Sequence, residues 1–101
     1  MDIKAILKSF LDERNRLTAF PAKRKMKIYA LFYLSTKFEP HRTYTEKEFN
    51  EILDQWHVFH DPATLRRELY NNRFIDRESD GRSYWLENEQ PTVAELEKKL
   101  I

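Results

Sequence analysis

The sequence contains no cysteine, which excludes disulfide bonds, zinc fingers, iron–sulfur clusters and catalysis by a thiol. Gly81 is its single glycine, which argues against glycine-rich phosphate loops and against flexible linkers. No apolar run approaches membrane-spanning length. The first eleven residues lack a signal-peptide pattern, because Asp2, Lys4 and Lys8 interrupt them. We therefore expect a cytoplasmic protein with no membrane partner.

An excess of one charge is also lacking. The 18 Lys and Arg nearly balance the 17 Asp and Glu, leaving a formal charge of +1, which supports a nucleic-acid partner only weakly. Residues 21–73 are more basic than the two ends, with ten basic and seven acidic side chains. With 101 residues and 41% hydrophobic content, the chain is expected to form one domain, residues 1–101, with a core from about 20 to 86.

The strongest structural signal lies between Asp61 and Trp85. Asp61 is a favourable N-cap and is followed by proline, so a short helix is expected over 61–70, with Leu65 and Leu69 on one face. Two strands, 74–78 and 83–86, are expected to be joined by an Asp-Gly turn. An arginine-bearing helix followed by a hairpin is typical of a winged helix, in which a recognition helix precedes the wing.

The N-terminal part is expected to contain two helices. Apolar spacing predicts an amphipathic helix over residues 1–12, either packed on this domain or acting as a dimer arm, and intramolecular packing is favoured. Residues 16–18 are interpreted as a short edge strand. Residues 22–38 are apolar nearly all round from Ile28 to Leu34 and are expected to form the most buried helix.

The middle and the end of the chain each carry a capping-box pattern. Residues 43–44 are expected to add a short strand, after which Thr45 and Glu48 form a capping box at the start of a third helix. Residues 57–60 are interpreted as the turn of a helix-turn-helix motif. A last short helix is expected over 92–100, which packs beside the first helix, frays or pairs with another subunit.

The helix that starts at Asp61 is the candidate DNA reader. In a helix-turn-helix such an element lies in the major groove, where Arg commonly pairs with guanine and Asn with adenine. The wing tip is placed for a minor-groove or phosphate contact, and a basic helix N-terminus suits a phosphate. The predicted nucleic-acid contacts are Lys23, Lys25, Arg66, Arg67, Tyr70, Asn71 and Arg82.

A structural interpretation stays open for these residues. Arg66 and Arg67 are also expected to be able to pair with neighbouring carboxylates, and the lysines fit a solvated charge run. The wing is not basic overall, which counts against strong non-specific binding because such binding depends on neutralising phosphates. Its acidic residues are Asp76, Glu78 and Asp80.

A metal site and an active site find little support. His57, His60 and Asp61, with His41 elsewhere, include a His-x-x-His spacing that lacks helical geometry and a clear third ligand. No nucleophile elbow, zinc-protease motif or phosphate loop occurs. We therefore expect no metal, no cofactor and no enzymatic activity.

Several segments resemble a bacterial family known only as a domain of unknown function. The resemblance spans about residues 20–85 and lies in 20–27, 37–50, 65–69, Asp76-Arg77, Asp80-Gly81 and Tyr84-Trp85. Its motif positions are Lys23, Lys25, Lys27, Arg42, Tyr44, Glu46, Glu48, Asn50, Arg66, Arg67, Asp80 and Tyr84. Members occur alone or behind a DNA-binding domain of the arsenic-repressor type. The resemblance thus implies a winged-helix-like fold and a link to transcriptional regulation, without a known activity.

Two details accompany the resemblance. A polar cluster is hypothesised among Arg42, Glu46, Glu48, Asn50, Arg66 and Arg67, with a structural role for Glu48 and Asn50 and a recognition role for Arg66. Arg73 stands where a glycine often ends a recognition helix in a left-handed conformation, and Asn72 is the residue expected to take over that role.

The sequence predicts an α+β winged helix, a helix-turn-helix plus a β-hairpin wing, with extra N- and C-terminal helices. The predicted function is a DNA-binding transcriptional regulator whose partner is double-stranded DNA. The alternative is a protein-interaction or dimerisation module with the same fold, forming a homodimer through its terminal helices.

Overall fold

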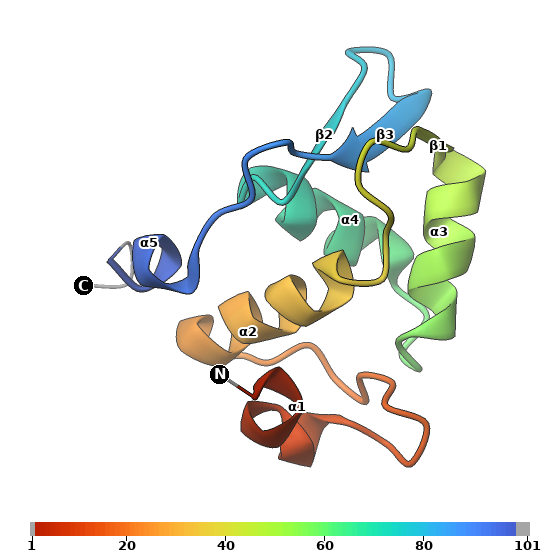
Figure 1. Cartoon of the computed structure of the whole chain (residues 1–101). Helices are drawn as coiled ribbons and strands as arrows, with labels where there is room; N and C mark the ends of the chain where they lie inside the picture. Colours follow the sequence, from red (N-terminus) through yellow and green to blue (C-terminus); the bar gives the residue numbers. More distant parts are fainter. Residues whose placement is uncertain (1, 99–101) are drawn as a thin grey trace.

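The helices lie between a β-hairpin at one end of the molecule and the N-terminal segment at the other (Figure 1). The structure is a computed structural model that describes residues 2–98. Its elements, in order, are α1 (Ile3–Ile6), the 3-10 turn η1 (Lys8–Phe10), α2 (Arg24–Ser35), β1 (Tyr44–Thr45), α3 (Glu46–Gln55), α4 (Pro62–Asn71), β2 (Ile75–Arg77), β3 (Ser83–Leu86) and α5 (Val93–Lys98). No helix within residues 2–98 is long and apolar enough to cross a bilayer.

Helix α2 is the most buried helix, as predicted, but it is shorter than the predicted 22–38. Seven of its residues, including Leu31 and Leu34, are buried. It begins at Arg24 because the backbone of Lys23 is extended. The Lys23 side chain makes no capping hydrogen bond. It ends at Ser35, where the hydrogen bonds tighten: the N–H groups of residues 36 and 37 bond carbonyls three residues back, at 3.2 and 3.0 Å.

Helices α3 and α4 begin where their capping residues predict. Thr45 Oγ1 accepts the Glu48 N–H at 3.1 Å, and the Glu48 carboxylate accepts the Thr45 N–H at 2.9 Å, which completes the capping box. Asp61 accepts the Thr64 N–H at 3.2 Å, ahead of Pro62 at the first helical position. Hydrogen bonds from Thr45 lower the pKa of Glu48, and those from Thr64 lower the pKa of Asp61.

His57 joins the end of α3 to the start of α4. Its ring is buried; Nδ1–H donates to the Leu53 carbonyl at 2.7 Å, and Nε2 accepts the Asp61 N–H at 2.9 Å. Both ring nitrogens are therefore engaged by backbone groups. Within the described residues, no group of three potential ligands is arranged to hold a metal ion. His57 thus connects the end of α3 to the start of α4 through two hydrogen bonds to the backbone.

The predicted edge strand at residues 16–18 is present only as isolated bridges. Leu17 pairs with Leu11 and with His57, and it exchanges backbone hydrogen bonds with Trp56 and Val58 at 2.8 and 3.0 Å. It therefore braces the α3–α4 corner and does not extend the sheet. The N-terminal segment is in this way tied to the middle of the chain.

The first helix is much shorter than the predicted 1–12, of which Met1 lies outside the described residues. The α-helix ends at Ile6 and is followed by the 3-10 turn η1. Asp12 then organises a tight turn, its carboxylate accepting the N–H groups of Arg14 and Arg16 at 2.9 Å each. Hydrogen bonding to Arg16 is the main reason why the pKa of Asp12 is lowered. The apolar residues of the segment nevertheless face this domain, with Leu7 fully buried.

The C-terminal helix α5 is also short. It spans Val93–Lys98, and the remainder of the predicted 92–100 helix lies outside the described residues. Thr92 Oγ1 accepts the Glu95 N–H at 3.1 Å, as expected for an N-cap. Leu96 is buried in the common core. This end of the chain therefore packs onto the domain at least through Leu96.

The three strands form one antiparallel sheet in the order β1-β3-β2. Tyr84 lies opposite both Tyr44 and Arg77, while Asp76 lies opposite Trp85. Because side chains alternate along a strand, Tyr44, Ile75, Tyr84 and Leu86 share the buried face. Gly81 has φ +73° at the hairpin turn, a conformation that favours glycine, and its N–H bonds the Glu78 carbonyl at 2.9 Å.

An aromatic cluster attaches the sheet to α3. Phe49, which is fully buried, stacks on Phe38 with ring centroids 4.1 Å apart. Tyr44 and Tyr84 from the sheet lie 6.2 and 5.5 Å from the Phe49 ring. The Tyr44 hydroxyl accepts the Glu39 N–H at 2.9 Å. The position of Tyr84 on the sheet is therefore set by its packing against α3.

Replacing the central ring of this cluster tests its importance. Phe49→Leu is expected to lower the free energy of unfolding by about 1–3 kcal/mol, because the fully buried Phe49 ring and its stacking on Phe38 are lost. Ile52→Val, which trims a partly buried side chain of the same helix, is expected to cost about 1 kcal/mol or less. Urea denaturation measures both, and an equal loss in the two variants would contradict a central role for Phe49.

Candidate functional site

A groove of about 360 Å³ separates α4 from the β2–β3 hairpin and is the candidate functional site. Its lining combines three guanidinium groups, two phenol rings and one amide. The lining residues are Ala63, Arg66, Arg67, Tyr70, Asn71, Arg77 and Tyr84. Four of the seven residues predicted to contact nucleic acid, Arg66, Arg67, Tyr70 and Asn71, are therefore brought together here.

The periodicity of α4 explains which residues face the groove. Leu65 and Leu69 are fully buried, as predicted. Ala63, Arg67 and Asn71 follow one another at intervals of four and so form a stripe on another side of the helix. Arg67 and Asn71 are exposed. The small side chain at Ala63 leaves the N-terminal end of this stripe open.

Two arginines of the groove differ from Arg66 in their surroundings. Within residues 2–98, no carboxylate oxygen lies within 4 Å of the guanidinium of Arg67 or of Arg77. The guanidinium of Arg77 lies over the Tyr70 ring, with Cζ 4.9 Å from its centroid. Tyr70 is 39% exposed and is the one large hydrophobic side chain classed as exposed in the described part of the chain. Sequence reasoning missed Arg77, because only the register of β2 turns its side chain toward α4.

Arg66, next to Arg67 in sequence, is in a different environment. Its side chain is only 17% exposed. Nη2 pairs with the Glu46 carboxylate at 2.8 Å, Nη1 donates to the Asn50 side-chain carbonyl, and Cζ lies 5.5 Å from the Tyr84 ring centroid. The guanidinium is therefore held by α3 and β3. These contacts favour the structural interpretation over the recognition role expected for Arg66.

The hypothesised polar cluster thus forms only in part. Arg66, Glu46 and Asn50 come together, as described above. Glu48 is occupied as the capping residue of α3. Arg42 instead pairs with Glu39 at 3.4 Å and lies over the Tyr44 ring, 4.8 Å from its centroid. The structural roles expected for Glu48 and Asn50 agree with these contacts.

The wing tip carries an exposed cation, as the sequence predicts. The Arg82 side chain is 85% exposed, and its Nε lies 3.4 Å from the Asp80 carboxylate. The other oxygen of Asp80 accepts the Arg82 N–H at 2.9 Å, which fixes the turn. An ion pair this exposed is worth little, so Arg82 is available to an external anion.

The two predicted lysines lie outside the α4–hairpin groove. Lys23 and Lys25 are exposed at the start of α2. Arg24, Lys27 and Ile28 of α2 line a smaller depression of about 250 Å³ together with Glu68 and Asn72 at the end of α4. The N-terminal end of α2 therefore lies beside the C-terminal end of α4.

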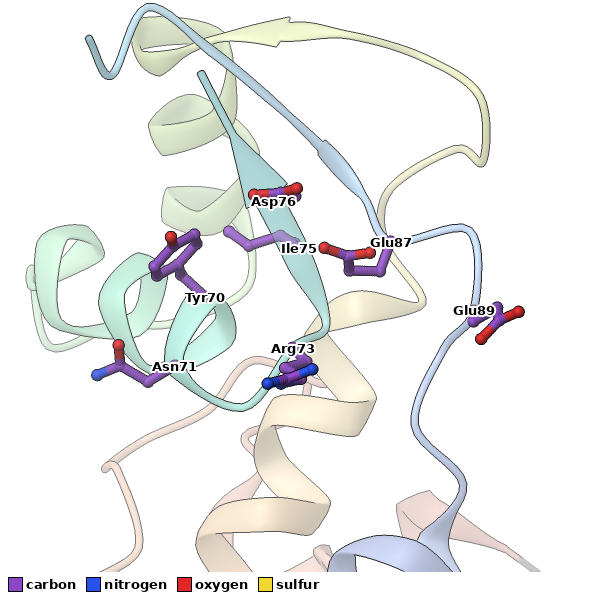
Figure 2. Close-up of a pocket in the computed structure, with 7 residues that line it drawn as sticks. All are labelled: Tyr70, Asn71, Arg73, Ile75, Asp76, Glu87 and Glu89. Carbon is purple, nitrogen blue, oxygen red and sulfur yellow. The ribbon is translucent and has the colours of Figure 1, made fainter. Parts of the chain in front are cut away.

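A second pocket, of about 460 Å³, lies at the C-terminal end of α4 (Figure 2). Tyr70 and Asn71 contribute to it as well as to the groove. Arg73, which also lines it, has φ +64° and so adopts the left-handed conformation that was expected at Asn72. Asn72 instead has φ −97° and its side-chain amide donates to the Glu68 carbonyl at 2.9 Å.

Two carboxyl groups meet in this second pocket. Asp76 on β2 and Glu87, just after β3, both face the opening (Figure 2). Burial is the main cause that raises the pKa of Glu87, and the charge of Asp76 and a hydrogen bond with it raise the pKa further. Arg73 acts in the opposite direction. The ionised form of Glu87 is therefore unfavourable in the folded protein.

The raised pKa of Glu87 predicts that removing its charge stabilises the folded protein at neutral pH but not at acidic pH. An acid with a raised pKa stabilises the fold below its unfolded pKa, near 4.5, and loses that contribution as pH rises through the folded pKa. Glu87→Gln is therefore expected to raise Tm at pH 7 and to leave it unchanged near pH 3.5. Glu89→Gln removes the same charge from an exposed position of the pocket and serves as control. Calorimetry showing the same gain at both pH values would refute the assignment.

Comparison with known proteins places the chain in a family. Residues 16–86 match the model of the family described as "Uncharacterized protein conserved in bacteria (DUF2087)". Comparisons with curated proteins and with solved structures found no match. The matched span runs from the bridge at Leu17 to the end of β3, so it contains the whole α4–hairpin groove. The chain therefore belongs to this uncharacterised family, which is conserved in bacteria.

Proposed function

We propose that this protein is a winged-helix DNA-binding protein that regulates transcription. In this proposal α3 and α4 form the helix-turn-helix, α4 enters the major groove and the β2–β3 hairpin is the wing. The order α2-β1-α3-α4-β2-β3 and the six-residue connection between α3 and α4 support this assignment. The proposal includes no catalytic role.

The observation that carries the proposal is that two guanidinium groups in one groove, those of Arg67 and Arg77, have no carboxylate within 4 Å among residues 2–98. Other arginines in the described residues, such as Arg14 and Arg24, also have no carboxylate within 4 Å. What distinguishes Arg67 and Arg77 is that both line one groove, beside the exposed phenol ring of Tyr70. Arginine forms bidentate hydrogen bonds with phosphate and with guanine. Duplex DNA offers both groups, guanine edges and phosphates, to a helix that lies in its major groove.

The charge distribution sets the strength of binding. Arg67, Arg77 and the exposed Arg82 offer three phosphate or base contacts, and the exposed Lys23 and Lys25 at the start of α2 are two further predicted contacts. Three to five phosphate contacts correspond to a slope of about −3 to −4.5 for log K against log salt concentration. The acidic residues of the hairpin oppose binding. We therefore expect modest affinity with a steep salt dependence.

Fluorescence anisotropy with a random-sequence duplex tests the proposal. Wild-type protein is expected to bind at low salt and to lose affinity with the slope given above. Arg67→Ala and Arg77→Ala are each expected to weaken binding and to reduce the slope by about one, because each removes a phosphate contact. The control is Arg14→Ala, which removes an exposed arginine from the segment between η1 and α2, far from the hairpin (Figure 1).

The alternative function, a protein-interaction module, makes a different prediction. Its specific support is Tyr70, since an exposed aromatic residue next to arginines is common in the centre of protein interfaces. A module of that kind gives a flat anisotropy trace at 20–50 mM salt with the duplex. A flat trace would overturn the DNA-binding proposal. A mass larger than that of one chain, measured by light scattering, would favour the alternative.

A further inference from the structure

We infer that Arg66 is a positioning residue that sets the orientation of α4 relative to α3 and the hairpin, and that it does not itself contact DNA. This inference deepens the proposed function, on which its binding experiments rest. Arg66 and Arg67 are adjacent and chemically identical, but the inference gives them different roles. Arg67 recognises the ligand, whereas Arg66 holds the helix that presents Arg67.

The hydrogen-bond geometry of Arg66 leaves little of it for a ligand. Each of the two terminal nitrogens has its own partner on α3, the Glu46 carboxylate at 2.8 Å and the Asn50 amide oxygen. One face of the guanidinium lies toward the Tyr84 ring of β3. Two of its five N–H donors bond α3 and the side chain is only 17% exposed, so little of the guanidinium is accessible to a DNA group.

The placement of the three partners explains how one side chain controls an orientation. Glu46 and Asn50 are four residues apart and so share one face of α3. Tyr84 is fixed independently, because it packs against Phe49 of α3 with ring centroids 5.5 Å apart. Arg66 thus connects α4 to two points along α3 and one point on the sheet. Three attachment points determine an angle, whereas a single contact determines only a distance.

The chemistry of the site also requires arginine. The guanidinium is planar and presents its donors in a fixed fork, so it can bond two acceptors one helical turn apart at the same time. A lysine keeps the charge but offers one compact ammonium group. Lysine is nevertheless a good phosphate binder. Arg66→Lys therefore separates positioning from direct contact with a DNA phosphate.

The decisive experiment removes charge from α3 and measures DNA affinity. Glu46→Ala deletes a carboxylate near the groove, and simple electrostatics predicts that DNA binding becomes tighter. Positioning predicts the opposite, a loss of about tenfold, because Arg67 is no longer correctly presented. Glu51→Ala makes the same charge change at an exposed position of α3 and is expected to bind as well as wild type or better. Circular dichroism at 15 °C confirms that each variant is folded.

Variants of Arg66 and Asn50 complete the binding test. Arg66→Ala, Arg66→Lys and Asn50→Ala are each expected to lose about tenfold in affinity with an unchanged salt slope, since no phosphate contact is removed. Wild-type affinity in Arg66→Lys, or a slope smaller by about one in Arg66→Ala, would overturn the inference in favour of a direct contact. Unchanged affinity in folded Glu46→Ala, Asn50→Ala and Arg66→Ala would show a merely structural role and overturn it as well.

A measurement without DNA keeps the inference separate from the proposed function. Residual dipolar couplings of the backbone amides report the orientation of α4 relative to α3 in wild type and in Arg66→Lys. A reorientation of α4 in the variant supports positioning even if wild-type protein binds no DNA, in which case only the proposed function fails. Identical helix orientations in the two proteins would overturn the positioning role whatever the DNA result.

Discussion

The packing of Phe49 against Phe38, Tyr44 and Tyr84 is the contact on which the rest of the structure depends. It is the place where α3, the segment after α2 and the sheet meet in one cluster. A sheet whose first strand has two residues cannot hold itself together by backbone hydrogen bonds alone. The aromatic rings supply the buried area that attaches it to the helices. Because Tyr84 is also one wall of the α4–hairpin groove, the core and the site share a residue.

The groove illustrates how a nearly neutral protein can still present a basic surface. Ion pairing elsewhere is local: Asp12 with Arg16 and Glu39 with Arg42 are neighbours in the sequence. Such pairs neutralise their arginines where they stand. Arg67 and Arg77 come from different elements, and neither has an acidic residue at ion-pairing distance within the described chain. The local positive potential therefore follows from which arginines remain unpaired, and the net charge of the chain says little about it.

Local signals were sufficient for most of the secondary structure. The capping box at Thr45, the N-cap at Asp61 and the Asp80-Gly81 turn act within four residues, so they can be read from neighbouring letters, and the structure confirms all three. The errors occur where local preference competes with a contact outside the window. Apolar spacing predicted a helix through residue 12, but the side chain of Asp12 closes a turn that brings Leu17 to the α3–α4 corner. Likewise Arg73, and not Asn72, takes the left-handed conformation that connects α4 to β2.

The sequence by itself determined that Leu65 and Leu69 face inward and that Arg67 and Asn71 face outward, because helical periodicity alone places them. It also determined the hairpin, through its single glycine. Only the tertiary structure decided that Arg66 is held by Glu46, Asn50 and Tyr84, while its neighbour Arg67 has no carboxylate within 4 Å in the described part of the chain. It also decided that Arg77 joins the groove. The partners of Arg66 lie between 16 and 20 residues away in sequence, and no periodicity within one element reports which side chains of another element will lie opposite.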